Sequence, residues 1–142
     1  ACAKSRTGFV IVFAGVPVLW QSKLQTQTAL STMEAEVIAL GACMKELLPI
    51  MDMVQSLAVA VGIPAGDVNM RVSVHEDNSG ALVLAETLPP QFTPRSKYYA
   101  TKTIWFCEEI NRHGIKLLKI ETSEQLWDMF TKGLAKPTFE YL

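Results

Sequence analysis

Hydrophobic residues follow two different periods along this chain, and each period predicts a type of element. Residues 8–14 form a continuous apolar, β-branched and aromatic run between Gly8 and Gly15, which is typical of a buried strand. Residues 16–22 follow directly, with Pro17 at a strand start where no ladder N–H is required. These two segments predict a hairpin.

A helical period begins after the hairpin and predicts one long helix over residues 32–61. Ser31 followed by Glu34 has the spacing of a capping box at its start. We expect Pro49 to kink this helix or to divide it in two. The apolar positions at helical spacing are Met33, Val37, Leu40, Met44, Leu47 and Met51.

The second half of the chain alternates between strand and helix signals. Val68, Met70, Val72 and Val74 share one face of a strand over residues 68–75. The remaining predicted elements are a short helix over 78–86, a helix over 97–112, a strand over 115–120 and a last helix over 123–134. This order predicts an α/β or α+β layered domain, and the antiparallel hairpin makes its sheet mixed.

Composition narrows the class of protein. The chain has 142 residues, of which 49% are hydrophobic, enough to exclude intrinsic disorder. Thirteen Lys and Arg against 14 Asp and Glu give a net charge of −1, so any nucleic-acid contact must come from a local patch. Three cysteines, Cys2, Cys43 and Cys107, favour neither a disulfide scaffold nor a zinc site, and we expect no membrane span.

Glu36 is the acidic residue that the helical pattern singles out. At about 100° per residue, Glu36 falls inside the apolar arc, with Leu40, Cys43 and Leu47 on the same side. Glu34 points about 200° away, toward Lys45, and we expect it to serve only as a cap. A buried carboxylate needs a metal, a partner or a raised pKa. The alternative is a Glu at the core edge whose carboxylate reaches solvent.

Two further carboxylates are candidates on position. Asp77 follows a predicted strand, where ligand-binding groups gather in α/β folds, or it is an N-cap with Asn78 and Ser79 as alternatives. Asp128 lies on the polar face of the predicted last helix, or that face is simply solvated. Hard cations such as Mg²⁺ prefer carboxylate oxygens, but spacing alone does not establish that the three residues converge.

Five blocks of sequence resemble, in this order, the ribonuclease H domain of copia-type retrotransposon Pol polyproteins. They are Ser5-Arg-Thr-Gly-Phe-Val10, Gln27-Thr-Ala-Leu-Ser-Thr32, Glu34-Ala-Glu-Val-Ile-Ala-Leu40, Glu76-Asp-Asn78 and Asp128-Met-Phe-Thr-Lys132. The resemblance covers nearly the whole chain. It implies a ribonuclease H-like mixed sheet flanked by helices, forming one domain over residues 1–142.

The resemblance also implies an activity and its partners. In such domains, carboxylates at the positions of Glu36, Asp77 and Asp128 are catalytic and hold two Mg²⁺ or Mn²⁺ ions that hydrolyse the RNA strand of an RNA–DNA hybrid. The implied partners are that hybrid and the adjoining reverse transcriptase domain, with no membrane contact. The implied location is intracellular, in a cytoplasmic virus-like particle and in the nucleus.

One departure from the family pattern weakens the expectation of activity. The family's first catalytic Asp lies on a first, central strand, and this chain has no acidic residue before Glu34. We therefore expect an N-terminally incomplete domain that lacks this strand and is impaired as an enzyme. The alternatives are an inactive transposon relic with residual nucleic-acid binding, and a plain α/β interaction module.

A basic stretch without acidic residues is the candidate nucleic-acid contact. Arg95, Lys97 and Lys102 lie among Tyr98, Tyr99 and Trp105. The family resemblance suggests contact with the phosphates of the hybrid. The alternative is a solvated basic helix start.

Overall fold

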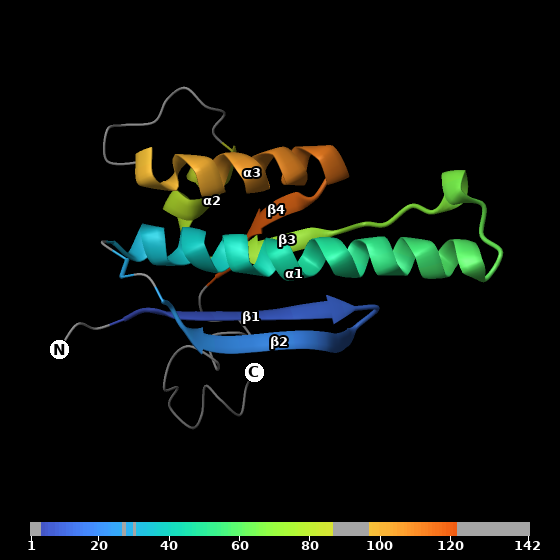
Figure 1. Ribbon diagram of the computed structural model, residues 1–142, viewed down its shortest axis with the longest axis horizontal. Helices are drawn as coiled ribbons and strands as arrows, with labels where there is room; N and C mark the ends of the chain where they lie inside the picture. Colours follow the sequence, from blue (N-terminus) through green and yellow to red (C-terminus); the bar gives the residue numbers. More distant parts are fainter. Residues whose placement is uncertain (1–3, 27, 30, 87–96, 122–142) are drawn as a thin grey trace.

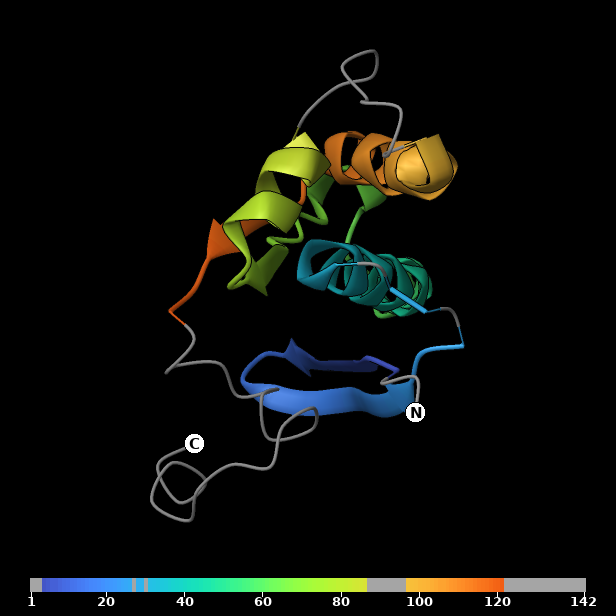
Figure 2. The same ribbon diagram turned by 90° about the vertical axis from the view of Figure 1, so that its left-hand side faces the viewer.

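One long helix separates two groups of elements in the computed structural model of this chain (Figure 1). The structure describes residues 4–26, 28–29, 31–86 and 97–121. Helix α1 (Thr32–Ala60) has the hairpin of β1 (Arg6–Phe13) and β2 (Val16–Leu24) on one side. Helices α2 (Ser79–Glu86) and α3 (Lys97–His113) lie on its other side, as Figure 2 shows end-on.

The strands form two separate pairs. In the hairpin, β1 and β2 run antiparallel, with Phe9 opposite Gln21. The second pair, β3 (Ser73–Glu76) and β4 (Lys116–Lys119), runs parallel, with Val74 opposite Leu117. The mixed α/β class is therefore confirmed, and it is compatible with a ribonuclease H-like fold. Within the described residues, however, the antiparallel and parallel pairs are not joined into one sheet.

The hairpin is buried on one face only. Ala14 and Gly15 both have positive φ, the conformation of the tight turns that match strand twist. Phe9 and Ile11 are buried toward α1, whereas Val12 and Trp20 are 51% and 60% exposed. The prediction of a buried strand therefore holds for one face of β1 only, because the outer face of the hairpin is not covered.

Helix α1 supplies the centre of the hydrophobic core. Its buried positions contact residues of the hairpin and of α3 in a single cluster. Met44 of α1 and Phe106 of α3 have no exposed surface, and the two helices approach closely where Gly41 lies beside the Phe106 ring. The members of the cluster on α1 are Val37, Leu40, Met44, Leu47 and Met51.

Pro49 does not divide α1, contrary to one of the two outcomes expected. The helix continues through Pro49, which is exposed. Proline leaves the carbonyl four residues earlier without its helical hydrogen bond. That carbonyl belongs to Lys45, which is also exposed, so a water molecule can replace the missing hydrogen bond at little cost.

Most of the other element predictions hold. The predicted helices over 78–86 and 97–112 correspond to α2 and α3, and the strand over 115–120 corresponds to β4. The strand expected over 68–75 is shorter: β3 includes only the residues that pair with β4. The predicted helix over 123–134 lies outside the described residues.

Two expectations from composition can also be checked within the described residues. Cys43 and Cys107 are free thiols, and burial is the largest cause that raises the pKa of each, to about 12 for Cys43 and about 11 for Cys107. None of the described helices combines the length and apolar character needed to cross a membrane.

A buried glutamine ties the hairpin to the helix. The side-chain amide of Gln25 donates to Thr7 Oγ1 at 3.1 Å and to the carbonyl of Ala35 at 2.9 Å. Gln25 and Thr7 are both buried, so these bonds are shielded from water. They fix the hairpin relative to the first turn of α1.

Unpaired strand edges lead to a prediction about solution behaviour. Each described strand pairs along one edge only, and unpaired edges promote association between chains. We expect residues 1–142 alone to self-associate as concentration rises, and Val12→Lys on β1 to reduce this. Sedimentation velocity over a concentration series measures it, with Asn111→Lys on α3 as a control of equal charge. A monomer with a sharp, reversible two-state melt would contradict the prediction.

Candidate functional site

The start of α1 departs from the helical-wheel prediction. Ser31 is the N-cap, as predicted, and its Oγ accepts a hydrogen bond from the Glu34 backbone N–H at 3.1 Å. Glu34, however, is only 8% exposed, so the expectation that its side chain points to the solvent side is wrong. The wheel assumed that one side of the helix faces water. Here α1 packs against the hairpin, α2 and α3, which cover more than one side.

Glu36 and Asp77 come from different elements and approach the same group. Glu36 is half-buried in the second turn of α1, and Asp77 is half-buried directly after β3. Both act on the carboxyl group of Glu76, the last residue of β3. The fold therefore brings together two of the three predicted site residues, and Asp128 lies outside the described residues.

The helix cap beside Asp77 is a different residue. Asn78 Oδ1 accepts hydrogen bonds from the backbone N–H groups of Gly80 at 2.9 Å and of Ala81 at 3.1 Å. These contacts cap α2 in the manner expected of an N-cap asparagine. The alternative interpretation of Asp77 as the N-cap is therefore wrong.

Glu76 is the site residue that sequence reasoning missed. It is 7% exposed, and its Oε1 accepts a hydrogen bond from the Asn78 backbone N–H at 3.0 Å. The alternation along the strand contained the signal: Val72 and Val74 share one face, and Glu76 is the next position on that face.

The environment of Glu76 favours its neutral form. The pKa of Glu76 is raised from its ordinary value of 4.5 to about 8, and burial is the largest cause. The hydrogen bond from the Asn78 N–H opposes this rise, whereas the negative charges of Glu36 and Asp77 and a side-chain hydrogen bond with Asp77 contribute to it. We call Glu36, Glu76 and Asp77 the carboxylate cluster. At neutral pH, its Glu76 carboxyl group is therefore protonated.

Cys43 on α1 is also close enough to Glu76 to be affected by its charge. After burial, the charges of Glu76 and then Glu46 contribute to its raised pKa. A thiol in such a position stays protonated and unreactive at neutral pH. Cys43 therefore lies near Glu76 as a protonated thiol and does not supply a nucleophile.

The carboxylates of Glu36 and Asp77 suit a hard cation, but by themselves they are too few to hold one. Carboxylate oxygens are the ligands that Mg²⁺ and Mn²⁺ prefer, so the chemistry of Glu36 and Asp77 fits such an ion. No group of three or more His, Cys, Asp or Glu in the described part of the chain is arranged to hold a metal ion. A metal at this site would need at least one further ligand.

The candidate nucleic-acid residues fall at the edge of what is described. Lys97 is the first residue of α3, and Lys102 lies within its second turn. Arg95 lies outside the described residues. Their role in binding phosphates stays a prediction.

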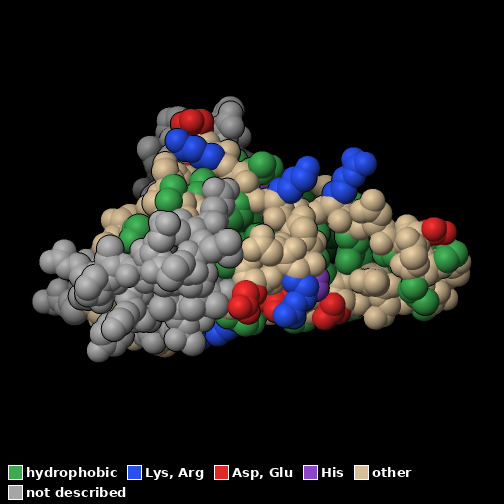
Figure 3. All heavy atoms as spheres, turned by 90° about the horizontal axis from the view of Figure 1, so that it is seen from above, with side chains coloured by type: hydrophobic (Ala, Val, Ile, Leu, Met, Phe, Trp, Pro, Cys, Tyr) green, Lys and Arg blue, Asp and Glu red, His purple; other side chains and the backbone are tan. Residues whose placement is uncertain are grey.

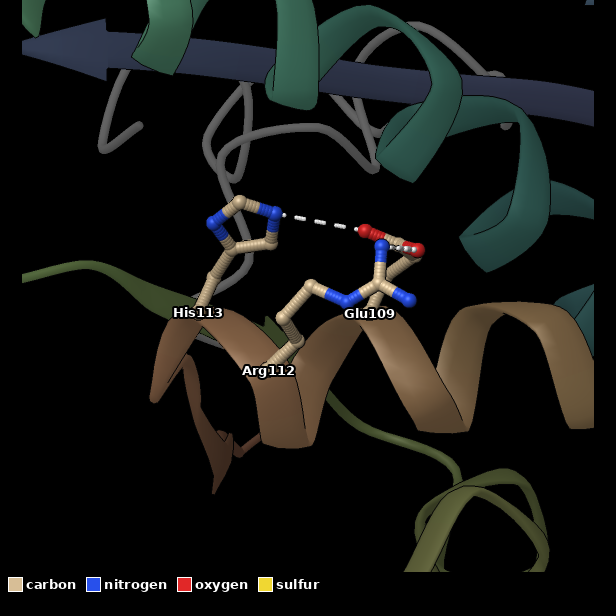
Figure 4. Close-up of polar contacts among 3 residues, drawn as sticks. All are labelled: Glu109, Arg112 and His113. Carbon is tan, nitrogen blue, oxygen red and sulfur yellow. Dashed lines mark ion pairs between the residues drawn. The ribbon is translucent and has the colours of Figure 1, made fainter.

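Neither histidine lies in the carboxylate cluster. Glu109 pairs with Arg112, Nη1 to Oε1 at 2.9 Å, and with His113, Nε2 to Oε2 at 3.2 Å, on the last turns of α3 (Figure 4). His75 is exposed on β3. The ion pairs of Glu109 are of the i,i+3 and i,i+4 kind that stabilise a helix end modestly.

Similarity to known proteins covers nearly the whole chain. Over 137 residues, 96% of this chain, it is 33% identical to the retrovirus-related Pol polyprotein from transposon TNT 1-94 of Nicotiana tabacum. Its homologues are transposon Pol polyproteins. The chain is also 25% identical to that from transposon RE2 and 24% identical to that from RE1, both of Arabidopsis thaliana, each over 136 residues.

The similarity does not identify which domain of these relatives the chain resembles. The matches cover 96% of this chain but only 10%, 9% and 9% of the three relatives, so the chain spans about one tenth of their length. No family model matches the chain, and no solved structure matches it. The similarity to transposon Pol polyproteins expected from the sequence is confirmed.

The raised pKa of Glu76 predicts how stability depends on pH. Between about pH 4.5 and 8, Glu76 is ionised in the unfolded chain and still protonated in the folded one, so the free energy of unfolding falls as pH rises. One pKa unit corresponds to about 1.4 kcal/mol, so the rise of the pKa from 4.5 to about 8 corresponds to a loss on the order of 5 kcal/mol.

Denaturant unfolding in the presence of a chelator, at a series of pH values, measures this loss. Glu76→Gln should remove it, because the amide does not titrate and has the same shape. Asp67→Asn, an exposed change in the turn η1 (Ala65–Asp67), is the matched control. Equal pH dependence in the parent chain and in Glu76→Gln would show that Glu76 is not the group responsible.

Proposed function

We propose that this chain is the ribonuclease H domain of a copia-type Pol polyprotein, which hydrolyses the RNA strand of an RNA–DNA hybrid. The proposal rests on the five sequence blocks and on the similarity to transposon Pol polyproteins. It assigns the catalytic and metal-binding roles to Glu36, Asp77 and Asp128.

The observation that carries the proposal is the approach of Glu36 and Asp77 to the same buried carboxyl group. Glu36 lies on α1 and Asp77 follows β3, and both raise the pKa of Glu76. Carboxylates that merely face water on separate parts of the surface would not both raise the pKa of one buried carboxyl group. Convergence of carboxylates from separate elements is what a metal-dependent nuclease requires.

Each residue of the cluster has a distinct part in this proposal. Glu36, Asp77 and Asp128 would hold two Mg²⁺ or Mn²⁺ ions. When bound, these ions would activate a water molecule and stabilise the leaving 3′ oxygen. Glu76 keeps a proton at neutral pH, which limits the negative charge that Glu36 and Asp77 face before a cation binds. Its hydrogen bond from Asn78 holds the turn that carries Asp77.

A second candidate function is an inactive relic that retains only nucleic-acid binding. The observation in its favour is that no three or more His, Cys, Asp or Glu in the described part of the chain are arranged to hold a metal ion. The two candidates differ in whether a chain that includes the family's first, central strand and its Asp is active.

Cleavage of a labelled RNA–DNA hybrid in Mg²⁺ tests the proposal. We expect residues 1–142 alone to cleave weakly or undetectably, about 100-fold or more below an intact domain, because one metal-binding carboxylate is missing. Extending the chain at its N-terminus with the residues that precede the matched segment in the tobacco relative should supply the strand and its Asp. The extended chain should then cleave the RNA strand.

Substitutions in the extended chain identify the residues responsible. Asp77→Asn and Glu36→Gln should each abolish cleavage, whereas Asp67→Asn and Glu46→Gln, which change exposed acidic residues, should preserve it. An extended, folded chain that does not cleave favours the relic. Strong cleavage by the bare chain, lost in Asp77→Asn, would show that the missing Asp is dispensable.

Hybrid binding should depend on salt through the basic residues of α3. Each phosphate contact contributes about one unit to the slope of log affinity against log salt concentration. Lys97→Gln and Lys102→Gln should each weaken binding and lower this slope by about one unit, in fluorescence anisotropy with Ca²⁺ to prevent cleavage. Lys23→Gln, which changes an exposed lysine of β2, is the control. Slopes equal to those of the control would place the phosphates elsewhere.

A further inference from the structure

The side of the hairpin that points away from α1 is exposed. Figure 2 shows the hairpin as the outermost of the described layers, with α1 on one side of it. Residues of β1 and β2 that pair directly point to the same side, so Val10 and Trp20 lie together on the side opposite the buried Phe9. Trp20 is 60% exposed there. We call this side, with Arg6, Val10, Trp20 and Ser22, the outer hairpin face.

A cationic side chain is held on this face close to the aromatic ring. Arg6 precedes the buried Thr7 and therefore points outward, and its Nη1 donates a hydrogen bond to Ser22 Oγ at 3.2 Å. Ser22 lies two residues after Trp20 on β2, so about 7 Å separates their Cα atoms. A guanidinium carries five N–H donors, and the bond to Ser22 uses one of them. The outer hairpin face therefore offers a ring and hydrogen-bond donors of a cation side by side.

The hairpin is a region where charge has only one sign. Residues 4–33 contain Lys4, Arg6 and Lys23 and no Asp or Glu, although the whole chain has a net charge of −1. Figure 3 shows the opposite side of the molecule, where acidic and basic side chains both reach the surface. A chain without net positive charge binds a polyanion through a local basic region of this kind.

The combination of ring and cation selects an unpaired strand of nucleic acid. A base stacks on an exposed aromatic ring only when it is unpaired, since the bases of a duplex are already stacked on one another. The phosphate beside that base would meet the Arg6 guanidinium and no acidic side chain of the hairpin. A second copy brings no acidic residue on its own hairpin for Arg6, and an anionic membrane brings no planar group to stack on Trp20.

We propose that the outer hairpin face binds single-stranded nucleic acid, with a base stacked on Trp20 and the adjoining phosphate held by Arg6. Lys4, exposed two residues before Arg6, extends the contact to a further phosphate. The site recognises the flat face of a base and a backbone charge, so it accepts any base. It lies on the other side of the hairpin from α1, which carries Glu36, so it needs neither a metal ion nor the proposed nuclease activity.

Fluorescence anisotropy with a labelled oligo(dT) of about 12 nucleotides tests the proposal. The 142-residue chain is used with a chelator, at concentrations at which sedimentation velocity shows a monomer. We expect Trp20→Leu to weaken binding about tenfold or more, because an apolar contact remains but stacking is lost, whereas Trp20→Phe should keep most of the affinity. Arg6→Gln should weaken binding and lower the slope of log affinity against log salt concentration by about 0.7.

The matched controls change exposed residues of the same kinds outside the hairpin. Leu57→Ala on α1 and Arg71→Gln before β3 should both bind like the parent chain. Circular dichroism and thermal melting should be equal in the parent chain, Trp20→Leu and Trp20→Phe, which shows that the hairpin is intact.

Competition identifies the ligand. Unlabelled oligo(dT) and oligo(U) should displace the probe and show whether DNA, RNA or both supply the strand, whereas an RNA–DNA hybrid of equal length should displace it poorly. Three results would overturn the proposal: no binding, binding that Trp20→Leu does not change, or displacement by the hybrid or by phosphatidylserine vesicles as effective as that by oligo(dT). Because no metal ion is present, none of these results bears on cleavage.

Discussion

The packing of α1 on several sides at once is the constraint on which the rest of the structure depends. Val37, Leu40 and Met44 share one buried cluster with the hairpin residues Phe9 and Ile11 and with α3. The two strand pairs are not joined to each other within the described residues, and α1 connects them by contacting β1 on one side and α2 and α3 on the other. Burial of apolar side chains is the main stabilising contribution here, and most of the buried side chains lie on this helix or pack in the same cluster as its residues.

The same packing creates the carboxylate cluster. Because α1 lies against the body of the protein from its first turn, Glu36 is held near the end of β3 rather than in solvent. Asp77 reaches the same place because β3 ends there and Asn78 starts α2. A buried Glu76 between them is costly when ionised, and a raised pKa is the physical consequence. The packing of α1 therefore accounts both for the burial of Glu76 and for the placement of Glu36 and Asp77 near it.

The far half of α1 shows what happens where this packing ends. Beyond Met51 the buried stripe is no longer covered, and the exposed side chains become apolar without gaining basic neighbours. One helix thus supplies the core with its near half and leaves exposed apolar side chains on its far half.

The sequence by itself determined the order and type of the elements, since periods of two and of 3.6 residues are local properties. It also determined the Ser31 cap and the choice of Glu36 and Asp77 as candidates. Only the tertiary structure decided that Glu34 is buried, because a helical wheel cannot show how many sides of a helix are covered. It likewise decided the part of Glu76, whose protonation depends on two residues brought close by folding, and the separation of the strand pairs, which depends on long-range pairing.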